Sequence, residues 1–97
     1  MDMNGKCVLL TGGTAGIGEQ MALQLKSKGA EVIITGRSLN RLEAMRKQGF
    51  EAIEADLHTP LGAERILQAL GDRPIDVLIN NAGQGVDHDF REKMPDA

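Results

Sequence analysis

Four glycines lie within seven positions of the segment VLLTGGTAGIGEQ, residues 8–20. They lack a Cβ, so they can adopt positive φ and let another group approach the main chain closely. The first N–H groups of the helix expected after them favour an anion such as a pyrophosphate. The segment therefore predicts a phosphate-binding turn, with a helix-starting turn that binds no ligand as the alternative. These glycines are Gly12, Gly13, Gly16 and Gly18.

The spacing of these glycines limits which type of phosphate-binding loop this segment can form. Gly13 and Gly18 have the G-x-x-x-x-G spacing of a P-loop, but Glu19 and Gln20 follow where that motif needs lysine and serine or threonine. The G-x-G-x-x-G order is also absent, because the order here is G-G-x-x-G-x-G. The loop excludes a Walker-type site and by itself indicates phosphate binding only weakly.

A charged residue lies at the end of the second expected strand, where the sequence reads TGRS. In dinucleotide-binding folds an acidic residue here binds the ribose 2′-hydroxyl, whereas an arginine accommodates a 2′-phosphate. A charge-assisted contact of this kind is worth roughly 1.5–3 kcal/mol, or about ten- to a hundredfold in affinity. Arg37 therefore predicts a preference for NADP over NAD, with a solvated charge at a strand end as the alternative.

Alternating strands and helices must position these residues. Apolar runs predict strands over 6–11, 31–36, 50–56 and 75–83. Helices are expected from Gly16, after a Ser38 cap and after Thr59 with Pro60, each ending at a glycine. Their expected apolar faces comprise Ile17, Met21, Ala22 and Leu25, then Leu39, Leu42 and Met45, then Ile66, Leu67 and Leu70.

This alternation is typical of an α/β protein with a parallel sheet and right-handed crossovers. We expect about four strands in the doubly wound order 3-2-1-4, with the first two helices on one face and the third on the other. Ligands bind such sheets at the carboxyl ends of the strands, where the strand order reverses. The two glycine-bearing segments, LTGG and INNAG, should therefore converge.

Composition excludes several other functions. The chain has 97 residues, a net charge of −3, and no tryptophan or tyrosine, which argues against a nucleic-acid surface. Its apolar runs are too short to span a bilayer and no signal peptide is visible, so we expect a cytoplasmic protein. His58 and the DHD stretch at 87–89 fit no metal-ligand spacing, Cys7 is interpreted as a small buried side chain, and residues 84–97 as a loop or flexible tail.

The motifs TGGTAGIG (11–18), GRS (36–38), ADL (55–57) and NNAG (80–83) together resemble the N-terminal half of a short-chain dehydrogenase/reductase. The resemblance extends to about Gly85 and implies a partial Rossmann-like fold. It implies that the pyrophosphate and adenosine ribose are bound by Thr11, Gly12, Thr14, Gly16, Ile17 and Gly18. It further implies that the 2′-phosphate lies near Thr14, Arg37 and Ser38, that the adenine borders Asp56 and Leu57, and that Asn80, Ala82 and Gly83 pack against the cofactor and stabilise the sheet. Asp56 as a cap of the turn before the third helix is the alternative.

The resemblance also implies hydride transfer between a nicotinamide and a small-molecule alcohol or carbonyl, with a tyrosine, a lysine and a serine as catalytic groups. The chain has no tyrosine, and its serines, Ser27 and Ser38, lie in the first two units. We therefore expect one truncated dinucleotide-binding domain over residues 1–97 that is inactive alone and forms homo-oligomers through the edge of its fourth strand. A nucleotide-binding module without catalysis and a fragment that only self-associates are the alternatives.

Overall fold

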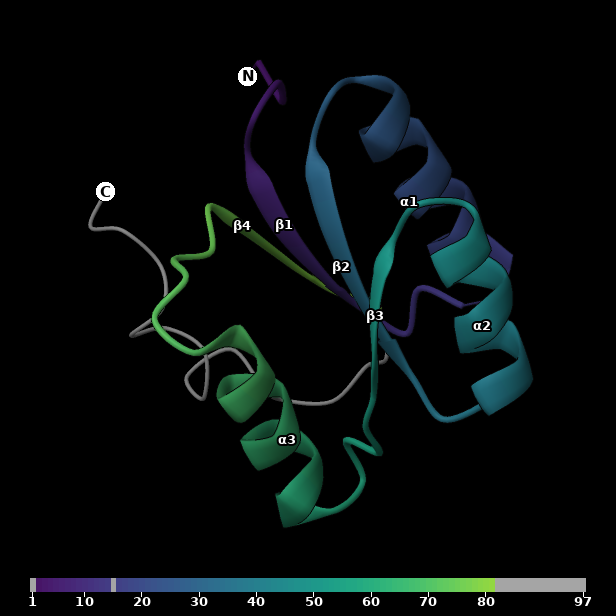
Figure 1. Ribbon diagram of the computed structural model, residues 1–97, viewed down its shortest axis with the longest axis vertical. Coiled ribbons are helices and arrows are strands. Elements are labelled where there is room, and N and C mark those ends of the chain that lie inside the picture. Colours follow the sequence, from purple (N-terminus) through teal and green to yellow (C-terminus); the bar gives the residue numbers. More distant parts are fainter. Residues whose placement is uncertain (1, 15, 82–97) are drawn as a thin grey trace.

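A computed structural model describes residues 2–14 and 16–81 of the chain. Its centre is a parallel sheet of four strands in the order β3-β2-β1-β4. Helices α1 and α2 cover one face and α3 covers the other (Figure 1). Both the predicted strand order and the placement of the helices are thus confirmed. The strands are β1 (Cys7–Thr11), β2 (Glu31–Gly36), β3 (Glu51–Glu54) and β4 (Val77–Asn80), and the helices are α1 (Gly16–Ser27), α2 (Leu39–Lys47) and α3 (Pro60–Leu70).

The register of the strands brings their carboxyl ends to one edge of the sheet. Thr11 at the end of β1 pairs with Thr35 of β2 and with Asn80 of β4. Gly36 at the end of β2 pairs with Glu54 at the end of β3. The turns that follow all four strands therefore open on the same side of the molecule, as the topology predicts.

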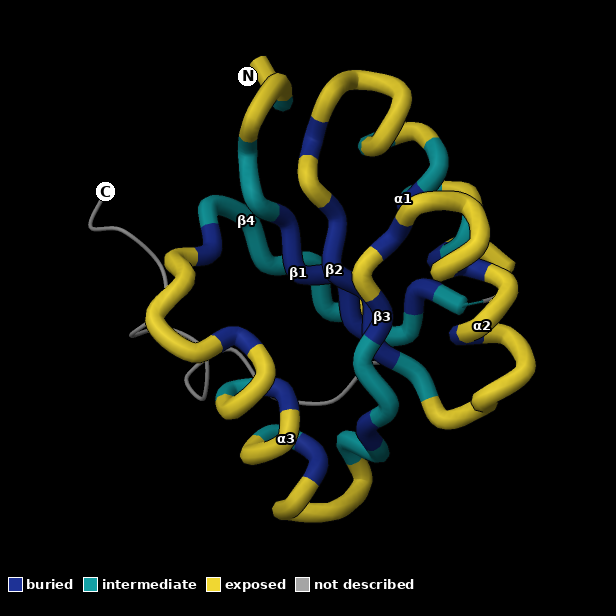
Figure 2. The backbone as a smooth tube through the Cα atoms, in the orientation of Figure 1, coloured by how far each residue is buried: buried dark blue, intermediate teal, exposed yellow. Residues whose placement is uncertain are grey.

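Side chains of the two central strands alternate between two apolar cores. Val8 and Leu10 of β1 are fully buried with Ile34 beneath α1 and α2, whereas Leu9 is buried with Ile33 beneath α3. Because both faces of these strands are covered, their sequences are continuous apolar runs (Figure 2).

The apolar faces of two helices differ from the expectation. Ile17 is 75% exposed and Leu39 is 58% exposed, although both were predicted to face the core. Helix α1 is buried instead through Gly18 and Ala22, whose small size brings its axis close to the sheet. Ile17 immediately precedes Gly18 and lies outside this contact. In α2 the buried positions are Leu42 and Met45, and Leu39, the first helical residue, remains outside.

The helix caps and strand ends agree in most places with those expected from the sequence. The Ser38 hydroxyl accepts a hydrogen bond from the Arg41 N–H at the start of α2. Thr59 makes no such cap at α3, because its hydroxyl donates to the Asp56 carbonyl at 2.9 Å. Strand β3 is shorter at both ends than the predicted 50–56, and β4 begins at Val77 rather than at residue 75. None of the described helices is long and apolar enough to cross a membrane.

Candidate functional site

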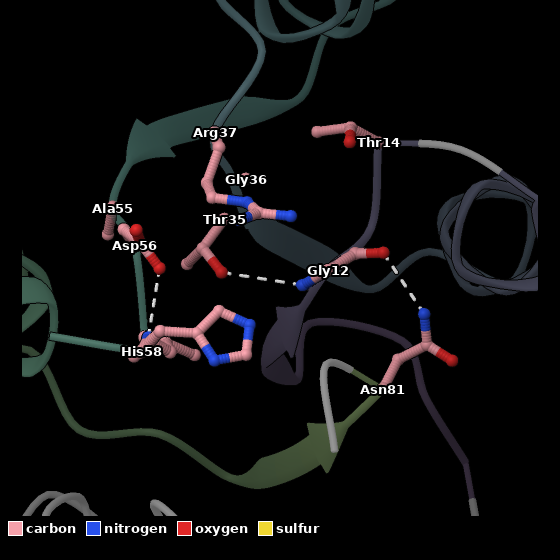
Figure 3. A pocket seen from close by; sticks show the side chains of 10 residues that line it. Gly12, Thr14, Thr35, Gly36, Arg37, Ala55, Asp56, His58 and Asn81 are labelled. Atoms are coloured by element: carbon pink, nitrogen blue, oxygen red, sulfur yellow. Dashed lines mark hydrogen bonds between the residues drawn. The ribbon is translucent and has the colours of Figure 1, made fainter. Parts of the chain in front are cut away.

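A pocket of about 260 Å³ lies where the four strands end (Figure 3). Each strand contributes a turn to it, so residues far apart in the sequence share one cavity. This confirms the predicted convergence of the turns after β1 and β4 and extends it to β2 and β3. The lining residues are Gly12 and Thr14 after β1, Thr35, Gly36 and Arg37 at the end of β2, Ala55, Asp56, Leu57 and His58 after β3, and Asn81 after β4.

The four glycines after β1 have two different roles. Gly12 and Gly16 have φ values of +73° and +60°, which side chains rarely adopt, so these two bend the chain. Gly13 and Gly18 have no positive φ and are required for space. A Cβ on Gly13 would lie 2.7 Å from Ile34 Cγ2, and one on Gly18 would lie 2.3 Å from the Gly12 carbonyl oxygen. Because Gly13 and Gly18 have no Cβ, the start of α1 can pack against the turn.

Hydrogen bonds hold this turn to the neighbouring strands. The Gly12 N–H donates to the Thr35 carbonyl oxygen at 3.0 Å, and the Asn81 side-chain amide donates to the Gly12 carbonyl oxygen at 3.0 Å. Beneath them, the buried Thr11 hydroxyl donates to the Asn80 side-chain oxygen at 2.9 Å. The turn is thus fixed to β2 on one side and to β4 on the other.

Arg37 lies at the rim of the pocket, opposite the turn that contains Thr14 (Figure 3). Gly36 makes room for Thr14, since a Cβ on Gly36 would lie 2.6 Å from Thr14 Cγ2. Arg46, Arg65 and Arg73 form ion pairs with glutamates. Among residues 2–14 and 16–81, no carboxylate pairs with the Arg37 guanidinium, so its charge remains available to a ligand.

The turn after β3 forms the opposite wall and is also held in place. One carboxylate oxygen of Asp56 accepts a hydrogen bond from the His58 N–H at 2.9 Å, and the Asp56 carbonyl oxygen accepts from Thr59. Gly62 of α3 packs so tightly here that a Cβ on it would lie 2.1 Å from that carbonyl oxygen. Asp56 therefore stabilises the turn, as the alternative interpretation expected, while also lining the pocket.

The predicted site residues are not all in this pocket. Gly12, Thr14, Arg37, Asp56 and Leu57 line it. Thr11, Gly18 and Asn80 support it through contacts behind the lining, Ser38 caps α2, and Gly16 and Ile17 border a separate shallow hollow beside α1. Ala82 and Gly83, like the predicted tail 84–97, lie outside the described residues.

Sequence reasoning missed five lining residues: Thr35, Gly36, Ala55, His58 and Asn81. The position of Asn81 beside Asn80, at the end of a strand, was the available signal for it. Gly36 and Ala55 adjoin residues that were selected and Thr35 lies two positions before Arg37, whereas His58 was considered only as a metal ligand. No group of three potential ligands suited to a metal ion occurs in the described part of the chain.

The described ionisable groups whose pKa values are shifted lie at the amino end of the sheet, opposite the pocket. The Arg73 guanidinium donates two hydrogen bonds to the Glu51 carboxylate, at 2.7 and 2.6 Å, which lower the pKa of Glu51 and raise that of Arg73. Burial, followed by the negative charge of Glu31, raises the pKa of the Cys7 thiol. Cys7 is only partly buried, whereas a buried side chain was expected.

The strand order, the glycine-rich turn and the pocket at the strand ends define a Rossmann-like α/β protein. The profile of the family described as short chain dehydrogenase matches residues 6–97. The chain therefore belongs to the short-chain dehydrogenase/reductase family of oxidoreductases.

Known proteins agree with this assignment. Serine 3-dehydrogenase of Agrobacterium fabrum is 42% identical over 81 residues, which are 78% of this chain and 32% of that protein. An NADP-dependent 3-hydroxy acid dehydrogenase of Salmonella typhi is 40% identical over 81 residues, 78% of this chain and 33% of its own. The solved structure of L-sorbose reductase from Gluconobacter frateurii, complexed with NADPH and L-sorbose, superposes with a TM-score of 0.72 at 31% identity, covering 88% of this chain and 36% of the reductase. The chain spans about a third of the length of these curated relatives.

Proposed function

We propose that this chain forms the NADP(H)-binding part of an oxidoreductase that transfers hydride between the nicotinamide and an alcohol or carbonyl substrate. The observation that carries the proposal is the pocket where the turn after β1, the turn after β3 and the Arg37 guanidinium meet. No carboxylate of the described residues pairs with this guanidinium. The bound cofactor would supply the hydride chemistry, and the residues of this chain would bind and orient it.

The pyrophosphate is assigned to the turn after β1. Gly12 and Gly16 bend the main chain there, and the first N–H groups of α1 carry the partial positive charge that favours an anion. Gly18 supports this fit because its missing Cβ leaves the helix start packed against the Gly12 carbonyl. Thr11 and Asn80 maintain the spacing of β1 and β4 beneath the turn.

The adenosine end is assigned to the pocket between β2 and β3. Arg37 and the Thr14 hydroxyl group would hold the 2′-phosphate of NADP, with Ser38 beside them, while Asp56 and Leu57 would border the adenine. The Arg37 guanidinium favours NADP over NAD, because a 2′-hydroxyl offers it no charge. The Salmonella relative named as NADP-dependent and the reductase solved with NADPH support this preference.

No residue of this chain is assigned as the catalytic acid or base. The family resemblance places that role on a tyrosine, and the sequence contains none. The proposal for this chain is therefore limited to binding and positioning the cofactor, within a single dinucleotide-binding domain.

A fluorescence titration of the chain with NADPH, and in parallel with NADH, tests the proposal. Saturable binding with at least about tenfold preference for NADPH is expected from one charge-assisted phosphate contact. Equal affinity for the two cofactors would contradict the assignment of Arg37. Failure to bind either one would contradict cofactor binding by this chain.

A further inference from the structure

His58 is a lining residue of the pocket for which neither the turn nor the family motifs provide a role. Its imidazole projects into the pocket, and Arg37 lies on the opposite side of the opening, with Thr35 and Gly12 between them (Figure 3). Within the described part of the chain the ring makes no hydrogen bond, and His58 is held to Asp56 through its backbone N–H. The ring is therefore presented to a ligand without competition from neighbouring side chains.

The turn that carries His58 is fixed before any ligand arrives. The Asp56 carboxylate holds the His58 N–H at 2.9 Å, and the Asp56 carbonyl oxygen accepts hydrogen bonds from the N–H and the hydroxyl of Thr59, at 3.1 and 2.9 Å. Gly62 allows α3 to pack directly against this carbonyl. Because the backbone is held by these contacts, a ligand need not order this turn when it binds, and within the turn it restricts mainly the imidazole side chain.

Aromatic surface is scarce in this protein. The sequence has no tryptophan or tyrosine and two phenylalanines. Phe50 is 5% exposed in the core beneath α1 and α2, and Phe90 lies outside the described residues. Among the described residues that line the pocket, His58 alone has an aromatic ring. A planar base bound there has the His58 imidazole and the Arg37 guanidinium plane available for stacking.

We propose that the His58 imidazole forms the wall of the adenine end of the pocket opposite Arg37 and stacks on the adenine base. This inference rests on the proposed function, because it assigns the adenosine half of the cofactor to this pocket. It gives the two side chains separate tasks: His58 recognises the base, which NADP and NAD share, and Arg37 recognises the 2′-phosphate, which only NADP carries. Stacking requires only an aromatic face on the side chain, so an aromatic substitute should preserve it.

The experiment uses adenosine 2′,5′-bisphosphate, which carries adenine and the 2′-phosphate but no nicotinamide. In calorimetric titrations, His58→Ala should weaken its binding about fivefold or more, a value at the low end for loss of a stacked aromatic ring. His58→Phe should restore most of the affinity, whereas His58→Asn should not. Gln68→Ala, an exposed change on α3, is the matched control and should bind as the unaltered chain does.

A proton NMR titration provides a readout that a structural role would not change. The ring current of a stacked adenine should shift the His58 imidazole proton signals upfield, and His58→Phe identifies those signals by their loss. Unchanged affinity in His58→Ala, or rescue by asparagine rather than phenylalanine, would overturn the inference while the proposed function stands. If the unaltered chain binds neither this probe nor NADPH, the proposed function and the inference fail together.

Discussion

The Asn81 side-chain nitrogen lies 3.0 Å from the Gly12 carbonyl oxygen, joining two turns that are 69 positions apart in the sequence. A Cβ on Gly18 would lie 2.6 Å from the same nitrogen and 2.3 Å from the same oxygen. The end of β4, the turn after β1 and the first turn of α1 thus meet in one contact. The shape of the proposed pyrophosphate site depends on this contact, so changes to it should affect stability and binding together.

Gly18→Ala should be the most disruptive single-methyl change in the glycine-rich turn. The added Cβ would strike the Gly12 carbonyl, and overpacking of this kind costs about 1–3 kcal/mol. Gly16→Ala is the comparison in the same helix: no atom of the described residues lies within 4 Å of its Cβ position, so it should cost only about 1 kcal/mol for the positive φ. Urea unfolding measures both, and a larger loss for Gly16→Ala would contradict the assigned roles.

Arg37 should determine the choice between the two nicotinamide cofactors. Arg37→Ala should weaken NADPH binding about ten- to a hundredfold and leave NADH binding nearly unchanged, because only the 2′-phosphate contact is lost. Lys47→Ala removes the same charge from the exposed end of α2 and serves as the control. Parallel loss of both cofactors in Arg37→Ala, measured by fluorescence titration, would indicate a structural role instead.

The Glu51–Arg73 pair should make a small, pH-dependent contribution to stability. Hydrogen bonding to Arg73 lowers the pKa of Glu51 in the folded state, so the contribution is present above the ordinary glutamate pKa and disappears as the pH falls through the lowered value. Both side chains are nearly half exposed, which limits it to less than about 1 kcal/mol.

Glu51→Gln should therefore destabilise the chain near neutral pH and have progressively less effect below about pH 4.5, the ordinary value for this group. Urea unfolding at several pH values measures the difference, with Glu64→Gln on the exposed face of α3 as the control. A difference that grows as the pH falls would show that the sign of the linkage is wrong.

Strand β4, the outermost described strand on its side of the sheet, should promote self-association. Within residues 2–14 and 16–81, β4 pairs with β1 on one side only, and its residues are all half-buried. A strand at the edge of a sheet can pair with a strand of another chain. We propose a dimer or larger assembly joined at this strand. Light scattering should give a mass above that of one chain, and a mass of one chain at micromolar concentration would contradict the proposal.

Most of the fold could be predicted because its signals are local. Continuous apolar runs marked the four strands, and Gly29, Gly49 and Gly71, each with positive φ, followed the three helices as expected. Strand order then followed from the alternation of elements and the handedness of crossovers. The predictions for Ile17 and Leu39 were wrong because periodicity identifies a helix but does not fix which part of it reaches the sheet.

The sequence alone determined the kinds of residues available to the site: glycines that can bend the chain, an arginine after the second strand, and polar groups after the others. Only the tertiary structure decided which of them share a pocket. In the structure, Gly13 and Gly18 allow close packing, and His58 and Asn81 line the pocket. These roles depend on contacts between segments that are distant in the sequence. Backbone preferences are properties of neighbouring residues, whereas steric room and cavity walls arise when the strands are placed side by side.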